Sequence, residues 1–288
     1  MSRLKPQAPA KRHALITGAS RGIGVHIAKR CAREGISLSL VARDREGLEE
    51  TAEFARHFGV EVETFPTDLL ARSGLEATVE AVLRHAGAVD ILVNNAGTYA
   101  PGRLEEREAL SLEREIALNL VSAMHLTRLL LPGMRERRFG RIVNIASLAG
   151  LVGASYSEVY CASKHGLVGF TRALRASLIQ DGLDTVHAVA ICPGYISDTG
   201  MFKDIQDAHS VRAPSWMGTS HPDKVADSVM KAIDGDNSPE VIVNQGPMRL
   251  GLSLMTAFPR LAERVFMKLG AHRTLAPVLE RRTQADHQ

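Results

Sequence analysis

Residues 13–35 read HALITGASRGIGVHIAKRCAREG, and this stretch decides the fold. The apolar run His13–Thr17 predicts a short strand, and the segment 22–34 predicts a helix. Gly35 follows at the position where helices commonly end. The turn 18–24, between strand and helix, is rich in glycine. A strand, a glycine turn and a helix in this order predict a phosphate-binding unit, because backbone N–H groups and the helix N-terminus both attract an anion.

The same alternation of strand and helix continues along the chain. Further apolar runs of strand length lie at 37–42, 60–65, 90–94, 141–146, 185–191 and 240–244. Helical segments between and around them lie at 45–58, 73–85, 110–137, 156–180 and 222–233. We expect Pro132 to bend the longest of them. This pattern predicts an α/β fold: a Rossmann-type, doubly wound parallel sheet of about seven strands with helices on both faces.

The chain is expected to form a single domain with two additions. The Rossmann-fold domain should occupy 12–245, after a flexible basic tail at 1–11 and before an amphipathic helical extension at 246–288. Apolar residues of the extension recur at helical spacing. We favour packing of the extension in a dimer. Peripheral membrane contact through 246–270 and packing within the chain remain the alternatives.

Composition excludes several classes of function. The net charge is +3, and the arginine-rich pieces lack interleaved aromatic residues, which argues against nucleic-acid binding. The three cysteines, Cys31, Cys161 and Cys192, are far apart, and neither His26 nor His165 has a second ligand at suitable spacing, so we expect no metal site. There is no signal peptide and no long uninterrupted apolar stretch, so we expect a cytoplasmic protein without a spanning helix.

The end of the second strand selects the nucleotide. An acidic residue there would bind the ribose of NAD, but Arg43 occupies the position and Arg21 lies in the glycine turn. Two guanidinium groups can form charge-assisted hydrogen bonds to the 2′-phosphate, so we predict NADP(H). The alternative is that Arg43 is a solvated loop residue and Asp44 takes the ribose.

Two later strand ends add polar groups. Asp68 follows the third strand. There its carboxylate would accept a hydrogen bond from an adenine amino group or, equally, serve as a helix N-cap. The run Asn94 to Gly97 follows the fourth strand. Its small residues would let a cofactor lie across the strand ends, and its asparagines would tie neighbouring backbone together.

The candidate catalytic residues gather at the carboxyl edge of the sheet. Tyr160 and Lys164 are one helical turn apart and project from one face. We expect the ammonium group of Lys164 to lower the pKa of the Tyr160 phenol, which makes Tyr160 a general acid and base. Ser147, at the end of the fifth strand, would hydrogen-bond a substrate carbonyl. The amide of Asn119, in the segment 110–137, would hold a water that links Lys164 to solvent.

Together these motifs resemble the short-chain dehydrogenase/reductase family over about residues 12–245. The matching residues are Thr17 to Gly24, Asp68, Asn94 to Gly97, Asn119, Ser147, Tyr160, Lys164 and Pro193-Gly194. The resemblance implies that Asn119, Ser147, Tyr160 and Lys164 form the catalytic tetrad. With the residues already argued, the expected cofactor site comprises Gly18, Ser20, Arg21, Gly22, Ile23, Gly24, Arg43, Asp68, Leu69, Asn95, Ala96, Gly97, Tyr160, Lys164, Pro193, Gly194 and Ile196.

The resemblance also bears on substrate and assembly. The family places a threonine five residues after the proline of the Pro-Gly run, but here Asp198 stands there and Thr199 follows. Residues 197–220 correspond to a mobile substrate lid whose large apolar residues are Met201, Phe202, Trp216 and Met217. They predict a lipophilic ketone or secondary alcohol, unless they only pack the lid on the core. The family further implies a homodimer or homotetramer through helices near 110–135 and 156–180.

The leading interpretation is an NADPH-dependent carbonyl reductase with Tyr160 as general acid/base. One alternative is a 3-oxoacyl thioester reductase, against which the long extension argues. Another is an alcohol dehydrogenase that works in the oxidative direction. A non-catalytic NADP(H) sensor or scaffold typically lacks the tyrosine or the lysine, and this chain has both.

Overall fold

The computed structural model describes residues 9, 11–209, 211–214, 218–236, 238–244, 258–268, 274–275 and 278. Most of the predicted tail 1–11 lies outside these residues, as does most of the extension 246–288. Two of the apolar lid residues, Trp216 and Met217, also lie outside them.

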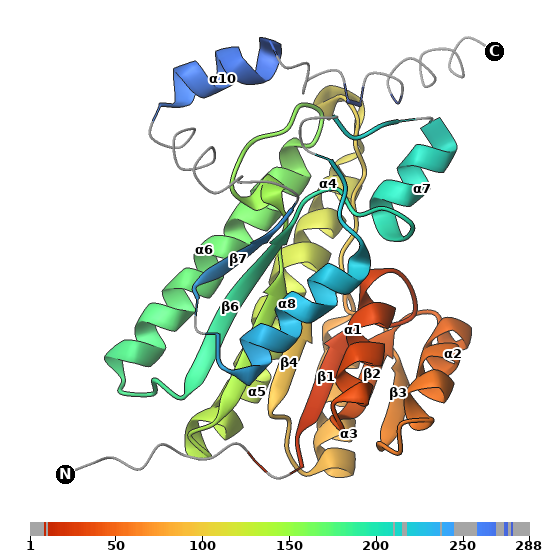
Figure 1. The fold of residues 1–288 in the computed structure, drawn as a ribbon, viewed down its shortest axis with the longest axis vertical. Coiled ribbons are helices and arrows are strands. Elements are labelled where there is room, and N and C mark those ends of the chain that lie inside the picture. Colours follow the sequence, from red (N-terminus) through yellow and green to blue (C-terminus); the bar gives the residue numbers. More distant parts are fainter. Residues whose placement is uncertain are drawn as a thin grey trace.

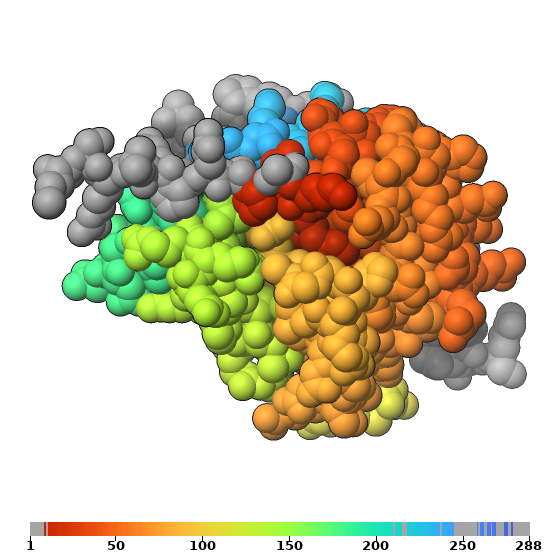
Figure 2. Space-filling view, turned by 90° about the horizontal axis from the view of Figure 1, so that it is seen from below, coloured from red at the N-terminus to blue at the C-terminus, as the bar shows by residue number. Residues whose placement is uncertain are grey.

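Seven parallel strands form one sheet in the order β3-β2-β1-β4-β5-β6-β7 (Figure 1). The strands are β1 (His13–Thr17), β2 (Ser37–Ala42), β3 (Val62–Pro66), β4 (Ile91–Asn94), β5 (Gly140–Ile145), β6 (Val186–Pro193) and β7 (Glu240–Val243). The order runs outward in both directions from β1, which confirms the predicted doubly wound topology. From below, the red start of the chain lies between the orange and green parts (Figure 2), as expected for a central β1.

Helices connect the strands. They are α1 (Ile23–Arg33), α2 (Arg45–Arg56), α3 (Arg72–Ala86), α4 (Ala109–Ile116), α5 (Ser122–Glu136), α6 (Glu158–Gln180), α7 (Gly200–His209), α8 (Pro222–Asp234) and α10 (Pro259–Lys268). Short 3₁₀ turns, η1 (Leu104–Glu106) and η3 (Leu148–Gly150), and a π turn, η2 (Ala117–Val121), complete the described elements.

The sheet is covered on both faces because its strands are apolar on both sides. On β1, Ile16 belongs to the buried cluster under α1, α2 and α8, whereas its neighbour Leu15 belongs to the cluster under α3, α5 and α6. Successive residues of a strand point to opposite faces, so one apolar run serves two cores. The carboxyl ends of the parallel strands therefore meet at one edge between two helical layers (Figure 1).

The structure differs from the sequence prediction in three places. The segment 110–137 is two helices, α4 and α5, joined by the π turn η2. Helix α6 begins at Glu158 rather than at Tyr156, because Tyr156 has a φ of 60°, which lies outside the right-handed helical region. The expected lid contains a helix, α7, that the sequence analysis missed. The bend expected at Pro132, inside α5, stays a prediction.

The helical region Ala109–Glu136 is long and apolar enough to cross a membrane by length and composition, and no other described helix is. The expectation of no spanning helix therefore does not follow from composition alone. However, its side chains Leu126, Leu130 and Met134 are buried in the core beneath the sheet. Such packing is typical of the core helix of a globular domain.

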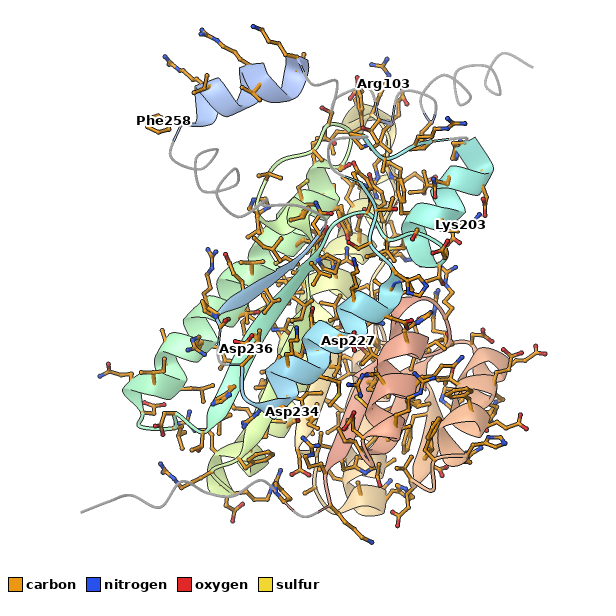
Figure 3. The ribbon with its side chains drawn as sticks, in the orientation of Figure 1. Arg103, Lys203, Asp227, Asp234, Asp236 and Phe258 are labelled. Carbon is orange, nitrogen blue, oxygen red and sulfur yellow. The ribbon has the colours of Figure 1, made fainter. Side chains whose placement is uncertain are left out.

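Beyond β7 the described chain includes α10 and three residues near the C-terminus. Helix α10 lies toward the same end of the molecule as the carboxyl ends of the strands (Figure 1). Phe258, at its start, and Leu261 are exposed, and Phe258 points away from the body (Figure 3). The predicted division of the chain at 12–245 and 246–288 stays a proposal.

His13 makes the domain sensitive to acid. The ring is buried at the start of β1, with Nε2 2.8 Å from Ser39 Oγ. Burial, helped by the charge of His85, lowers the pKa of His13 to about 4. In the unfolded chain the His13 ring takes up a proton at higher pH than it does in the folded protein. The folded protein therefore keeps its full stability above pH ~6.5 and loses part of it as pH falls toward 4.

The free energy of unfolding of the wild type should fall between pH 7 and pH 4.5. In His13→Gln we expect this fall to be smaller by roughly 1–2 kcal/mol. Urea denaturation at the two pH values measures this difference, with the exposed His57→Gln as the matched control. An equal pH dependence in His13→Gln and wild type would contradict the assignment.

Candidate active site

The glycine turn after β1 forms a cradle at the carboxyl edge of the sheet. Gly18 and Gly22 have φ values of 65° and 64°, a left-handed conformation that favours glycine. A Cβ at Gly24 would lie 2.1 Å from the Gly18 carbonyl oxygen, so no side chain fits there. The Asn95 amide donates to the carbonyl oxygens of Thr17 and Gly18, at 3.0 and 3.1 Å. These contacts fix the turn, and no side chain covers its backbone. A dinucleotide pyrophosphate can therefore approach the backbone N–H groups closely.

Most of the predicted cofactor residues line one cleft above this turn. They are Gly18, Ser20, Arg21, Gly22, Ile23, Arg43, Asp68, Leu69, Asn95, Ala96 and Gly97. Gly24 is not among the lining residues and instead packs behind the turn. Asp68 accepts a hydrogen bond from the Leu70 N–H at 3.0 Å, and the N-cap of α3 is Ala71. Asp68 is therefore not the helix cap, and its predicted contact with adenine stays a prediction.

The two arginines of the cleft differ in their partners. Arg21 Nη1 lies 2.8 Å from Asp204 Oδ2 on α7, in an exposed ion pair. Arg43 lies at the end of β2, and among the described residues it has no ion-pair partner. Asp44 follows it in the same cleft. The cleft thus presents one arginine that a phosphate can pair with directly, and a second that is shared with α7.

A second cleft continues from the first and holds the candidate catalytic side chains. Both clefts are lined by Ile23, Asn95, Gly200 and Met201. The second adds Ser147 from the end of β5, Tyr160 and Lys164 from α6, and Pro193, Gly194 and Ile196 from the end of β6. Segments far apart in sequence therefore meet because their strands end at the same edge.

Tyr160 and Ser147 form the polar centre of this cleft. Both side chains line the cleft, and Ser147 Oγ accepts from the Ala149 N–H at 3.1 Å. Burial raises the pKa of Tyr160 to about 12, and the neighbouring Ser147 hydroxyl offsets only part of this. The predicted lowering of the Tyr160 pKa is therefore wrong for the protein itself, because burial disfavours the charged phenolate.

Lys164 is buried beneath Tyr160. It is 2% exposed, its Nζ donates to the Ile145 carbonyl oxygen at 2.8 Å, and Nζ lies 5.7 Å from the centre of the Tyr160 ring. Burial lowers the pKa of Lys164 to about 8, although the charge of Glu115 acts in the opposite direction. The lysine is still mostly charged at neutral pH, and its side chain lines the catalytic cleft.

Asn119 lies behind the cleft rather than in it. Its Nδ2 donates to the Thr98 carbonyl oxygen at 2.9 Å and to Ser163 Oγ at 3.1 Å, while its Oδ1 accepts from the Thr98 N–H at 2.7 Å. Both N–H groups are thus taken within the protein. These bonds link the loop after β4 to α6, and the predicted water-holding role of this amide stays a prediction, because Oδ1 can accept a second hydrogen bond.

Sequence analysis missed two tyrosines that line the catalytic cleft. The Tyr99 ring lies 4.6 Å from the Tyr160 ring, and its hydroxyl is 2.7 Å from Ser157 Oγ. The Tyr195 ring lies 4.5 Å from that of Phe202 on α7. Each tyrosine closely follows a strand end at the carboxyl edge, and this position was the available signal.

Thr199 also lines the catalytic cleft. The preceding residue, Asp198, has a φ of 70°, which turns the chain so that the threonine reaches the cleft one position later than the family pattern. The side chain of Asp198 is mostly exposed and lies near His221 instead.

A buried ion pair behind the cleft was also missed. Glu115, on α4, is 1% exposed, and its Oε2 lies 2.8 Å from Arg107 Nη2. Burial raises the pKa of Glu115, and Arg107 counteracts part of that shift. The Glu115 charge in turn raises the pKa of both Lys164 and Tyr160. Nothing in the sequence marks this pair, because acidic residues of helices usually face solvent.

Comparison with known proteins bears on this arrangement. The family model described as short chain dehydrogenase matches residues 12–210. The ketoacyl reductase HetN of Nostoc sp. is 40% identical, over 89% of this chain and 88% of its own length. A crystal structure of an actinorhodin polyketide ketoreductase with NADPH is 34% identical, with a TM-score of 0.73 over 81% of this chain and 95% of that one. An NAD⁺-bound xylitol dehydrogenase is 25% identical, with a TM-score of 0.73 over 82% and 98%.

Proposed function

The chain belongs to the short chain dehydrogenase family, and from this premise we propose that it is an NADPH-dependent reductase of lipophilic ketones. One observation carries the proposal: the side chains of Tyr160 and Ser147 line a cleft that continues into the glycine cradle. A dinucleotide whose pyrophosphate lies on the cradle would extend its nicotinamide into this cleft, next to a carbonyl held at the two hydroxyls. The membership alone supports an oxidoreductase acting on carbonyl and hydroxyl groups.

The side chains divide the reaction between them. The cofactor, when bound, supplies the hydride. Tyr160 is protonated at neutral pH, because burial raises its pKa to about 12, and it donates this proton to the carbonyl oxygen. Ser147 hydrogen-bonds the same oxygen. Lys164 places a positive charge beneath the ring, which stabilises negative charge as the proton leaves. In the oxidative direction Tyr160 is the base, and its high pKa makes that direction slower at neutral pH.

The walls of the cleft support an apolar substrate. Tyr99, Leu148, Tyr195 and Phe202 surround the polar pair Ser147 and Tyr160. A few convergent polar groups within an aromatic wall suit a carbonyl that carries a hydrophobic group.

A 3-oxoacyl thioester reductase is the second candidate. The ketoacyl reductase HetN aligns over 88% of its own length and 89% of this chain. The long extension therefore does not argue against this activity, contrary to the expectation from sequence. An acyl chain also fits the apolar walls, whereas oxidation of polyols is less well matched to them.

Oxidation of NADPH by the purified protein tests these proposals. Ketones of graded size and 3-oxoacyl thioesters serve as substrates, with NADH as the control cofactor. Turnover that requires NADPH and rises with apolar bulk is expected, and the ratio between the two substrate classes separates the two candidates. Tight NADPH binding with no turnover of any carbonyl would instead favour an NADP(H) sensor or scaffold.

The preference for NADPH is attributed to Arg43. We expect Arg43→Asp to reduce the NADPH-over-NADH ratio of kcat/KM by roughly 10–100-fold, because a charge-assisted bond to the 2′-phosphate is replaced by repulsion. Arg45→Asp is the matched control, because Arg45 is exposed and lies outside the cleft. If Arg43→Asp leaves the ratio intact, the nucleotide is selected elsewhere.

Assembly is proposed from the exposed apolar surface. Leu104, Leu112, Ile116, Val121 and Val159 line an open apolar groove where α4, η2 and the start of α6 meet. We propose that this groove is covered in a homodimer or homotetramer. A monomeric mass in analytical ultracentrifugation at micromolar concentration would contradict this.

The alternative of membrane contact through 246–270 also stays a proposal. Helix α10 exposes Leu261 and Val265 beside Arg260, Arg264 and Lys268. Basic residues flanking an apolar strip suit an anionic lipid surface. Failure to sediment with anionic vesicles at low salt would contradict this contact and would support the predicted cytoplasmic setting.

A further inference from the structure

Three residues near the C-terminus pack against the catalytic cleft. Leu275 and Val278 are 8% and 2% exposed, and they share a buried cluster with Ile205 and Val211 of the lid region. Burial raises the pKa of Tyr195, and the neighbouring Thr274 side chain acts in the opposite direction. We call Thr274, Leu275 and Val278 the C-terminal strap. It lies more than 30 positions beyond the last strand, yet it is in contact with residues that line the substrate cleft.

The strap lies behind an aromatic wall. Tyr99 and Phe202 pack against the cluster that holds Leu275 and Val278, and both also line the catalytic cleft. Tyr195, which has Thr274 as a neighbour, packs on Phe202 with ring centres 4.5 Å apart. The aromatic side chains therefore face substrate on one side and have the strap behind them.

The strap also packs against the buried side of α7. Among the described side chains of α7, Ile205 is the one that is buried, and it is buried in the cluster with Leu275 and Val278. Two further described attachments are the packing of Phe202 on Tyr195 and the ion pair of Arg21 with Asp204, which is exposed and so holds the helix weakly. Without the strap, Ile205 would lose two of its buried apolar neighbours, and the position of Phe202 would be less firmly fixed.

We propose that the C-terminal strap is part of the substrate site and determines which substrates fit. By fixing Phe202 and Tyr195 over the cleft, it sets the space for the apolar group next to the carbonyl. The inference rests on the proposed reductase function. In this view the C-terminal extension selects among ketones or acyl thioesters by the shape of the apolar group next to their carbonyl. The strap residues are positioning residues, since they act through the aromatic wall.

Truncating the strap while keeping the cofactor site intact tests the proposal. In Leu275→Ala/Val278→Ala we expect the ratio of kcat/KM for a bulky aryl ketone over acetone to change by at least tenfold, mainly through KM. The dissociation constant of NADPH, followed by its fluorescence, should stay within about twofold. Leu261→Ala is the matched control, because it removes a leucine of the extension that is exposed on α10. Thr274→Val, which removes only the hydroxyl group next to Tyr195, should give a smaller change in the same direction.

A second readout does not require turnover. Lys203 lies on α7 with its side chain 41% exposed (Figure 3), so trypsin cleavage there reports release of the helix. We expect cleavage after Lys203 to be at least tenfold faster in Leu275→Ala/Val278→Ala than in wild type and Leu261→Ala. Unchanged cleavage and an unchanged substrate ratio in a folded variant would overturn the proposal. If cleavage is faster in the double variant but the wild type reduces no ketone, the contact of the strap with α7 is supported and the proposed reductase function is rejected.

Discussion

Replacing Tyr160 with phenylalanine is expected to lower kcat for ketone reduction by about 10²–10⁴-fold. The change removes one oxygen, and with it the proton that the carbonyl oxygen would receive. The ring, its 5.7 Å distance from Lys164 Nζ and the glycine cradle all remain. NADPH affinity should therefore stay within about threefold of wild type. Steady-state kinetics and fluorescence titration of NADPH measure the two quantities.

Tyr99→Phe is the matched control for this variant. The two rings are neighbours, but the Tyr99 hydroxyl is bonded to Ser157 rather than to Ser147. We expect Tyr99→Phe to change kcat by only a few-fold. If the two substitutions lower kcat equally, Tyr160 is not the proton donor.

The pH profile of the wild type should then report Lys164 rather than Tyr160. With a pKa of about 12, Tyr160 keeps its proton throughout pH 6–9. Lys164, with a pKa of about 8, loses its charge as pH rises through that value. Reductive kcat/KM, which reports groups of the free enzyme, should accordingly be flat below about pH 7 and decline above about pH 8.

Replacing Arg107 with alanine is expected to lower the free energy of unfolding by about 3 kcal/mol at pH 7. The change leaves the Glu115 carboxylate buried without its partner, at a site 1% exposed. Protonation relieves an unpaired buried carboxylate, so the difference from wild type should shrink as pH falls toward about 4.5. Urea denaturation at pH 7 and pH 5 measures both effects.

Arg103→Ala provides the comparison. Arg103 lies in the same loop and pairs with Glu106 at 3.4 Å, but both side chains are about half exposed (Figure 3). Its removal should cost less than about 0.5 kcal/mol. In the double variant Arg107→Met/Glu115→Leu most of the lost stability should return, because no buried charge remains. If Arg107→Ala and Arg103→Ala lower the free energy of unfolding equally, water reaches the Glu115 carboxylate and the pair is not a buried one.

The fold and the polar centre of the site could be predicted from the sequence because both depend on local pattern. Apolar runs such as His13–Thr17 and Ser37–Ala42 matched β1 and β2 residue for residue. The carboxyl ends of parallel strands lie at one edge of the sheet, so Ser147 and Tyr160 could be expected to lie close together there.

What the sequence could not predict depends on burial and on long-range contact. The pKa of Tyr160 is set by how much water reaches its hydroxyl, and helix spacing alone does not report that. The bond of Arg21 to Asp204 joins residues 183 positions apart. The π turn η2 lies in a stretch whose helical periodicity runs without a break. Contacts of these kinds appear only when the chain is folded.

That π turn has a consequence for changes in chain length. A π turn holds one more residue than an α turn, so the helix after it is rotated by about 100° relative to a continuous α-helix. Asn119 lies within the turn and reaches Thr98 and Ser163 from there. Deleting one residue from 117–121 would restore a regular helix and turn either the α4 side or the α5 side away from its neighbours. This segment should therefore tolerate replacement of a side chain far better than a change of a single residue in its length.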